Sequence, residues 1–406
     1  MGQTLSEPIV DKHSNEGEDD RMVYGASCMQ GWRISMEDAH TTLLNIDDCE
    51  SSHSFFGVYD GHGGNGVAKY SGKQLHMRIA KDEAFKKRDY ATAIKNGFLG
   101  TDVDLREDPE YVNEPSGCTA VVALITPDNR LFVGNAGDSR AVVCVNGEAI
   151  DLSHDHKPVN KDESARIVAA GGYVEFGRVN GNLALSRAIG DFEFKRNETL
   201  PAEQQVVTAN PDIQEHKLTD EVEFLVLACD GIWDCMSSQE VIDFVRREIA
   251  RKESLAAACE HLMDRCLAPD SEIGGVGCDN MTVIIIGFLN GRTKEEWYDW
   301  MAKKVPETAQ VDRFGNTIPS IDGQDEEKAA MLVDEKENKV KSEATPTLDE
   351  NSNEEDEVEV EIDNDNGDSE GKVKANSQQV EIQDEDNKQR LLTQSPNPIS
   401  YSEDKN

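Results

Sequence analysis

Three short apolar runs follow one another between residues 119 and 145, and they constrain the fold more than any other part of the sequence. They are Thr119–Thr126, Arg130–Asn135 and Ala141–Val145. Turn-forming residues separate them, and Asn146-Gly147 follows the last run. Runs of this length and composition indicate strands, and Asn-Gly is a strong hairpin signal. Connections this short join antiparallel neighbours, so we expect a β-meander within an antiparallel sheet.

Further strands and two pairs of helices are indicated on both sides of this region. Three more apolar runs are strand candidates: Ser54–Tyr59, Glu223–Ala228 and Met281–Leu289. Four segments show helical periodicity, in two successive pairs: Val67–Lys81 with Tyr90–Leu105, and Ser238–Arg251 with Ser254–Leu267. Helix pairs placed between strand clusters do not make a regular βαβ repeat. They favour an α+β domain in which the sheets lie between layers of helices, with the number of sheets left open.

The C-terminal quarter of the chain differs from the rest in charge. Residues 301–406 contain 28 acidic and 12 basic side chains and very few aromatic ones. Such a segment cannot bury enough apolar surface to offset the entropy lost on ordering. We therefore expect residues 306–406 to be a disordered acidic tail. A short helix at 293–305 precedes it, in which Trp297, Trp300 and Met301 share one face.

The net charge of the whole chain excludes some classes of partner. The chain has 80 acidic and 41 basic residues, a net charge of -39. This excess argues against sequence-independent nucleic-acid binding, which needs Lys and Arg opposite the phosphates. It also argues against a basic membrane-binding patch. No apolar run is long enough to span a bilayer.

The N-terminus and the cysteines indicate where the protein works. Met1–Ser6 fits the N-myristoylation pattern, with Gly2 as the acceptor. One acyl chain would hold a membrane only weakly and reversibly. The nine cysteines contain no Cys-x-x-Cys pair, which favours buried thiols in a reducing compartment. We expect a monomer in the cytoplasm, the nucleus or both.

Acidic residues stand at the ends of apolar runs. Asp60, Asp138, Asp230 and Asp279 each border such a run beside Gly or Asn, and the pair Glu37-Asp38 follows an earlier one. A single Asp-Gly would be explained as a turn. Strand ends at one edge of a sheet can gather carboxylates, which repel one another unless cations lie among them. Oxygen ligands without a Cys or His cluster select magnesium or manganese rather than zinc.

Two more side chains suit a reaction at phosphorus. Two hard metal ions can share a water molecule, lower its pKa and direct it at a phosphate ester. Arg33 can bind phosphoryl oxygens through two parallel hydrogen bonds. His62, two residues after Asp60, can protonate the leaving oxygen near neutral pH. The residues therefore favour metal-dependent hydrolysis of a phosphate ester.

Seven short motifs, in order, resemble those of the type 2C metal-dependent protein serine/threonine phosphatases over roughly residues 20–290. They are Gln30–His40, Val58–Gly64, Ser116–Ala120, Asn135–Ala141, Leu183–Asp191, Ala228–Asp234 and Asp279–Thr282. The short opening Met1-Gly2-Gln3 resembles eukaryotic, in particular fungal, members. Cys118 stands where Ser is usual, which we interpret as a core substitution. The tail does not resemble the helical extension of animal members, so no partner choice is implied.

The resemblance implies a fold that the residues alone left open. It is an α+β fold, a sandwich of two antiparallel sheets flanked by helix pairs (α-β-β-α). The catalytic domain would span residues 21–292, after an N-terminal segment at 1–20. The segment from His154 to Val179, here called the flap, would be a mobile cover over the site.

The resemblance also implies phosphoprotein substrates and a set of functional residues. Arg33 would bind the substrate phosphate and His62 would act as the general acid. Two magnesium or manganese ions would be held by Glu37, Asp60, the backbone oxygen of Gly61, Asp230 and Asp279. The adjacent Asp38 is a further candidate ligand, and Asp138 and Asp234 would hold a weaker third ion. Asp191 ends its motif but receives no role.

Three other functions are weighed against this one. An inactive phosphatase-like binding module would lack ligand residues, and none is missing here. An acidic scaffold would fit the tail composition but not the complete ligand set. Another two-metal hydrolase, such as a nuclease or phosphodiesterase, is disfavoured by the net charge and by the order of the motifs.

Overall fold

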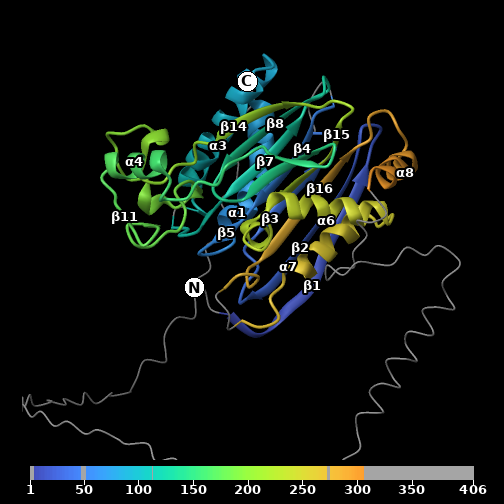
Figure 1. Cartoon of the computed structure of the whole chain (residues 1–406). Coiled ribbons are helices and arrows are strands. Elements are labelled where there is room, and N and C mark those ends of the chain that lie inside the picture. The colour runs from blue at the N-terminus through green and yellow to red at the C-terminus, as the bar shows by residue number, and fades with distance from the viewer. Residues whose placement is uncertain (1–3, 47–51, 112, 272–274, 306–406) are drawn as a thin grey trace, which may run out of the picture. The chain divides into compact units, whose positions relative to one another are not determined.

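The computed structural model describes residues 4–46, 52–111, 113–271 and 275–305, which contain two large antiparallel sheets (Figure 1). The six-stranded sheet has the order β1 (Thr4–Glu18), β2 (Met22–Arg33), β16 (Met281–Phe288), β15 (Val222–Ala228), β9 (Arg140–Val145) and β10 (Glu148–Asp151). The five-stranded sheet has the order β14 (Asp212–Lys217), β8 (Arg130–Ala136), β7 (Ala120–Ile125), β4 (Ser54–Tyr59) and β3 (Ala39–Leu43). The prediction of an α+β fold with antiparallel sheets is confirmed.

Two smaller sheets complete the described strands. The first contains β13 (Ile189–Gly190), β6 (Gly117–Cys118) and β5 (Gly61–His62), in that order. The second is a hairpin of β11 (Val174–Glu175) and β12 (Arg178–Val179) inside the flap. The flap also contains α4 (Lys161–Ala169), and it projects at the left of Figure 1. A small apolar cluster that includes Ile167 and Val179 fixes it to residues 188–207.

Alternating side chains build three apolar layers. Along β4, Phe56 and Val58 face the other sheet, whereas Phe55 and Tyr59 face the helices. The helices over the five-stranded sheet are α1 (Gly66–Lys81), α2 (Glu83–Lys86) and α3 (Tyr90–Glu107). Those over the six-stranded sheet are α6 (Ser238–Ala250), α7 (Leu255–Cys266) and α8 (Lys294–Lys304). Two sheets with helices on both outer faces follow from this period of two in the strands.

Helix ends agree with their local sequence. The side chain of Ser237 caps α6 and Glu240 returns a hydrogen bond, which makes a capping box. In α8, Trp297 and Met301 are fully buried and Trp300 packs beside them. The predicted apolar face of this short helix is therefore confirmed.

One predicted pairing is wrong. The meander places β9 beside β8, but β8 pairs with β7 and β14, whereas β9 pairs with β15 and β10 in the other sheet. Residues 137–139, here called the crossover, carry the chain between the sheets. Gly137 makes this possible, with a φ of 122° and no room for a side chain, since a Cβ would lie 2.6 Å from that of Thr119. Turn residues show that strands are consecutive but do not show that they pair.

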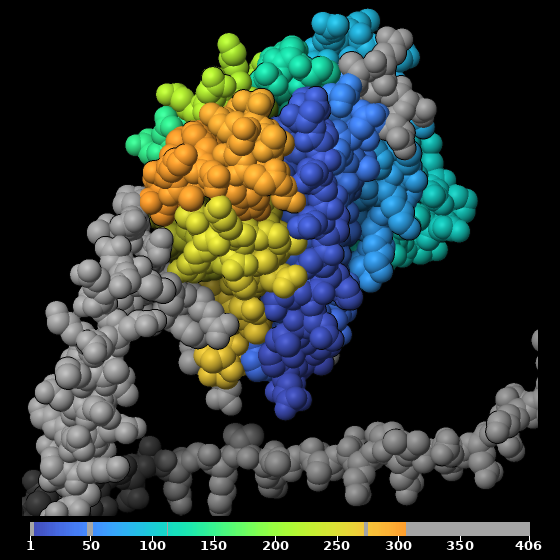
Figure 2. Space-filling model, turned by 90° about the vertical axis from the view of Figure 1, so that its right-hand side faces the viewer, coloured from blue at the N-terminus to red at the C-terminus, as the bar shows by residue number. Residues whose placement is uncertain are grey.

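The N-terminal segment also differs from the prediction. Residues 1–20 were expected outside the catalytic domain, yet Thr4–Glu18 forms β1 at the edge of the six-stranded sheet. Figure 2 shows this strand in dark blue beside the C-terminal helices in yellow and orange. Lys12 contacts Asp264 of α7 at 2.6 Å, and Lys294 of α8 contacts Glu18 at 3.0 Å. Backbone pairing and these polar contacts hold a strand that has little apolar surface.

Some predictions concern other parts of the chain. The acylation predicted at Gly2 and the disordered tail predicted at 306–406 lie outside the described residues. Among the residues that the structure describes, none of the helices has the length and apolar character needed to cross a membrane.

Candidate active site

The predicted acidic residues meet at one end of the sandwich because of the strand register. Asp60 follows β4, and Asp138 lies in the crossover between β8 and β9. Asp230 follows β15 as the first residue of α5 (Asp230–Trp233), and Asp279 precedes β16. Ala228 at the end of β15 pairs with Val283 near the start of β16 and with Arg140 at the start of β9. Antiparallel pairing thus brings the ends of β9, β15 and β16 together in one sheet, and Asp60, after β4 of the other sheet, shares a pocket with their acids.

A pocket of about 400 Å³ contains most of the predicted site residues. It is lined by Arg33, Asp60, Gly61, His62, Thr119, Asp138, Arg178, Leu183, Ala184, Leu185, Asp230 and Asp279. Glu37, Asp38 and Asp234 are not among the lining residues. Thr119 was not predicted, and it fixes the start of the loop after β4. Its N–H donates to the Asp60 carbonyl oxygen at 2.9 Å, and its hydroxyl accepts from the Asp60 N–H at 3.2 Å.

The carboxylates of the pocket repel one another. Burial raises the pKa of Asp60 well above its usual value, and the charges of Asp230, Asp38, Asp279 and Asp138 raise it further. Burial, followed by the charges of Asp138 and Asp279, does the same to the pKa of Asp230. Like charges at close quarters favour binding of a cation or a proton.

Glu37 and Asp38 lie beside the pocket-lining residues without lining the pocket themselves. Ser35 Oγ donates to Glu37 Oε1 at 2.8 Å, and the Gly64 N–H donates to Glu37 Oε2 at 3.2 Å. Asp38 is buried, and its Oδ2 accepts from the Thr282 hydroxyl at 2.6 Å. Its Oδ1 has no hydrogen-bond partner among the described residues. Burial, with a contribution from the charge of Asp279, raises the pKa of Asp38 to about 7.

Asp138 and Asp234 form the side of the site nearest the flap. Asp138 is 4% exposed and pairs with Lys157 Nζ. Burial raises the pKa of Asp138, Lys157 opposes this, and the charges of Asp155 and Asp234 add to the rise. Asp234 lies at the C-terminal end of α5, one turn after Asp230. Lys157 was not predicted, and its only signal was its position in the His154–Pro158 stretch.

The donor set suits hard divalent ions, although the protein's own cations compete for it. In the described part of the chain, no three Asp, Glu, His or Cys side chains lie close enough together to hold an ion. Arg33 pairs with Asp279 and Lys157 pairs with Asp138. The oxygen-only donors, their mutual repulsion and the unpartnered Asp38 Oδ1 nevertheless fit magnesium or manganese. Arg33 and Lys157 would therefore compete with a bound ion for Asp279 and Asp138.

His62 has a partner that the sequence did not reveal. Its Nε2 donates to Asp191 Oδ2 at 2.7 Å, and Asp191 is 5% exposed. Gly117 lies against this pair, and a Cβ there would be 2.3 Å from Asp191 Oδ2. Burial opposes a charge on His62, but the hydrogen bond and charge of Asp191 prevail and raise its pKa. Asp191 ends the Leu183–Asp191 motif, but nothing in that motif indicated that its side chain would hold His62.

The flap contributes to the wall of the pocket. Arg178 on β12 and residues 183–185 just after the flap line it. The prediction that this segment lies at the site agrees with these contacts, whereas its mobility stays a prediction. Cys118 is fully buried, as expected of a core substitution.

Comparison with known proteins gives a consistent result. Residues 22–273 match the family model described as Protein phosphatase 2C. The chain is 61% identical over 312 residues to Protein phosphatase 2C homolog 2 of Hypocrea jecorina, which covers 75% of this chain and 71% of the relative. It is 56% identical over 308 residues to the protein of the same name in Schizosaccharomyces pombe, covering 75% and 83% of the two chains.

A solved structure shows the same fold. A phosphatase from a pathogenic strain of Toxoplasma gondii matches with a TM-score of 0.60 and 26% sequence identity. The match covers 69% of this chain and 96% of that one.

Proposed function

Because this chain belongs to the protein phosphatase 2C family of metal-dependent hydrolases, we propose that it removes phosphate from phosphoserine and phosphothreonine in proteins. One observation carries the proposal. Carboxylates from both sheets share a pocket with an arginine and with a histidine that is itself held by a buried aspartate. This combination provides cation binding, phosphate binding and proton transfer within one pocket.

The acidic residues divide into two proposed groups. Glu37, Asp60, the backbone oxygen of Gly61, Asp230 and Asp279 would hold two magnesium or manganese ions, with Asp38 as a further candidate ligand. Asp138 and Asp234 would hold a third, weaker ion. When bound, the ions supply a water nucleophile at neutral pH and neutralise the repulsion among the carboxylates.

The two other residues act on the substrate. Arg33, freed from Asp279, would bind two oxygens of the phosphoryl group and orient it. His62 would give a proton to the departing serine or threonine oxygen. Its Nε2 is held by Asp191, so Nδ1 is the atom available for this transfer. Asp191 fixes the ring and stabilises its charged form, which agrees with the raised pKa of His62.

Phosphate release tests the proposal directly. The full-length protein should hydrolyse a phosphothreonine peptide with manganese and stop when a chelator is added. Asp138→Ala should reduce turnover less than Asp60→Asn at high manganese concentration. A protein that binds the phosphopeptide but releases no phosphate at any manganese concentration would instead be an inactive binding module.

A further inference from the structure

One histidine, His156, makes two hydrogen bonds to Gly137 in the crossover that carries Asp138. The N–H of Gly137 donates to His156 Nδ1 at 3.2 Å, and the backbone N–H of His156 donates to the Gly137 carbonyl oxygen at 2.9 Å. Asn135 Nδ2 also donates to this oxygen, at 3.2 Å. His156 is 4% exposed, so water does not compete for these contacts. The position of His156 therefore sets the position of the peptide that leads into Asp138.

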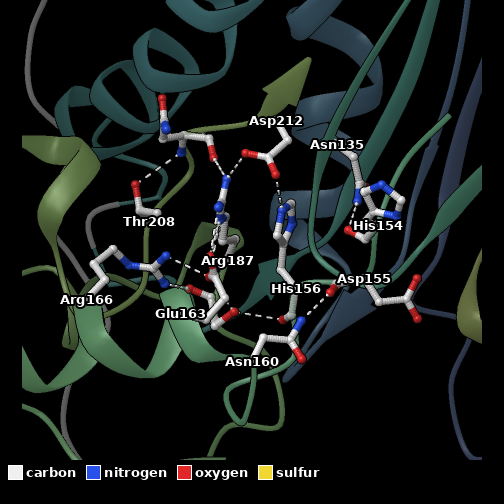
Figure 3. Close-up of polar contacts among 12 residues, drawn as sticks. Asn135, His154, Asp155, His156, Asn160, Glu163, Arg166, Arg187, Thr208 and Asp212 are labelled. Atoms are coloured by element: carbon white, nitrogen blue, oxygen red, sulfur yellow. Dashed lines mark hydrogen bonds and ion pairs between the residues drawn. The ribbon is translucent and has the colours of Figure 1, made fainter. Parts of the chain in front are cut away.

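The hydrogen bonds of His156 define its protonation. Its Nδ1 accepts from an N–H and must carry the lone pair, so Nε2 carries the proton. Nε2 donates to Asp212 Oδ2 at 3.1 Å, on the strand beside β8 (Figure 3). The ring is thus fixed as one neutral tautomer between a carboxylate and a backbone amide. This arrangement orients a ring but does not itself touch the pocket.

The residue after His156 acts on the same aspartate. Lys157 Nζ pairs with Asp138 Oδ2. Two consecutive residues at the start of the flap therefore control Asp138, one through its backbone and one through its charge. Any displacement of this dipeptide changes both the position of the Asp138 carboxylate and its neutralisation.

Two routes connect His156 to the flap helix α4. In the inner route, the Ser186 N–H donates to the His156 carbonyl oxygen at 3.2 Å, and the Ser186 hydroxyl donates to Glu163 Oε2 of α4 at 2.6 Å. In the outer route, Arg187 contacts Glu163 Oε1 at 2.7 Å and Asp212 Oδ1 at 2.7 Å. Ser186 and Glu163 are buried, whereas the Asp212 side chain is 54% exposed. The inner route is therefore the less screened by water.

The two carboxylates of this connection, Glu163 and Asp212, have lowered pKa values. Burial alone would raise the pKa of Glu163, but hydrogen bonds from Arg187 and Ser186 and the charge of Arg166 lower it to about 2. The hydrogen bond from His156 and the charge of Arg187 lower the pKa of Asp212. Both carboxylates therefore stay charged near neutral pH and act only as hydrogen-bond acceptors in this network.

From these contacts we infer that His156 is a positioning residue for Asp138, through which the placement of the flap helix sets the affinity of the third, weaker metal ion. The inference rests on the proposed role of Asp138 as a ligand. Coupling of this kind is reciprocal, so an ion at Asp138 also favours the flap position seen here. A protein substrate that contacts the flap would then change ion binding without touching any ligand.

Manganese binding to the full-length protein tests the inference without relying on turnover. Titrations followed by the electron paramagnetic resonance of free manganese resolve tight and weak ions. Asp138→Ala should lose the weak ion. His156→Ala should bind the weak ion about 10- to 100-fold less tightly, the usual effect of losing a residue that orients a ligand. The tight ions should bind as in the wild type.

Substitution by asparagine is the conservative variant. In His156→Asn the amide oxygen can take the place of Nδ1 and accept from the Gly137 N–H, while the contact with Asp212 is lost. This variant should recover most of the affinity that His156→Ala loses. Arg187→Met, which breaks the outer route and leaves His156 intact, should weaken the same ion by a smaller factor.

A matched control separates positioning from loss of stability. Glu248 of α6 is 3% exposed and bonds to Arg251 and His261, away from the pocket. Glu248→Gln should lower the thermal midpoint in chelator yet bind manganese normally. The inference is overturned if His156→Ala binds the weak ion like the wild type, or if Glu248→Gln weakens it equally. Normal manganese binding by a wild type that releases no phosphate would count against the proposed function and not against this inference.

Discussion

Two buried carboxylates in this domain, Asp138 of the pocket and Glu163 of the flap, have nearly the same exposure and opposite shifts of pKa. Asp138 is 4% exposed and Glu163 is 3% exposed. The pKa of Asp138 is raised, because burial and the charges of Asp155 and Asp234 outweigh the charge and hydrogen bond of Lys157. The pKa of Glu163 is lowered to about 2. Its hydrogen bonds come from two arginines and a serine.

The two acids differ in the charges of the groups that surround them. A carboxylate that serves the fold is neutralised by the protein's own guanidinium groups. The carboxylates of the pocket are gathered with one another and only partly neutralised, an arrangement that favours binding of cations from solution. Burial alone therefore does not identify a functional acid, whereas the sign of the charges around it does.

The largest effect is expected at the centre of the pocket. Asp60→Asn should abolish phosphopeptide hydrolysis at ordinary magnesium and manganese concentrations, since it removes a charge that we propose binds the ions. In chelator the same variant should be at least as stable as the wild type, because one of several repelling charges is gone. Initial rates and thermal unfolding measure the two effects. If Asp60→Asn were less stable than the wild type in chelator by several kcal/mol, Asp60 would be a stabilising acid like Glu163, and the proposed difference between the two would be wrong.

The next effect concerns proton transfer. His62→Gln should slow hydrolysis of a phosphothreonine peptide by about 100- to 10,000-fold, the usual contribution of a general acid. It should slow an aryl phosphate much less, because a phenolate leaves without a proton. Asp191→Asn should act in the same direction and add nothing in the His62→Gln background. Equal slowing of both substrates, with a raised manganese requirement, would make His62 a support for the metal site.

A matched pair of isosteric substitutions sharpens the comparison itself. In chelator at neutral pH, Glu163→Gln should lower the free energy of unfolding by about 3–5 kcal/mol, because it leaves two arginines without their partner. Asp138→Asn should change it little, since its partner Lys157 is half-exposed. Chemical denaturation measures both. Equal losses would show that the surroundings of the two acids do not differ in the way described.

The stabilisation that the Glu163 carboxylate provides should depend on pH. The folded-state pKa of Glu163, about 2, lies below its ordinary value of 4.5. The stabilisation it provides is therefore complete above about pH 4.5 and is lost as the pH falls through 2. The stability difference between the wild type and Glu163→Gln should narrow over that interval.

The smallest effect is expected at the C-terminus. A chain ending at Val305 should fold and hydrolyse an aryl phosphate at close to the full-length rate, because the apolar layers are complete with α8. A chain ending at Gly291 is the control. It loses the fully buried Trp297 and Met301 and should unfold at a clearly lower temperature. Loss of cooperative unfolding on truncation at Val305 would contradict the first expectation.

Local sequence was sufficient for most elements but not for their pairing. Ser54–Tyr59 has the predicted bounds, since an unbroken apolar run ends at Asp-Gly. The sheet that contains β9 could not be read from its turns, because sheet membership depends on packing across the domain. Thr4–Glu18 was missed for another reason. An edge strand held by backbone pairing and polar contacts needs no apolar alternation.

The candidate site was predictable in residue type more than in contacts. Seven of the predicted residues line one pocket, since acids at strand ends converge once the sheets pair. The pairing of His62 with Asp191 joins positions 129 residues apart, and no local pattern reports it. The same holds for the ion pair of Lys157 with Asp138.

The crossover between the sheets bears on the order of events during folding. Asp60 and Asp138 reach the pocket from the five-stranded sheet, and Asp230 and Asp279 reach it from the six-stranded one. Neither half gathers all four acids alone, so their full mutual repulsion arises only when the two sheets pack together. Divalent ions should accordingly slow unfolding and leave the early folding rate unchanged. If the proposed ion sites are right, ion uptake would report the last step of folding, because it requires carboxylates from both sheets.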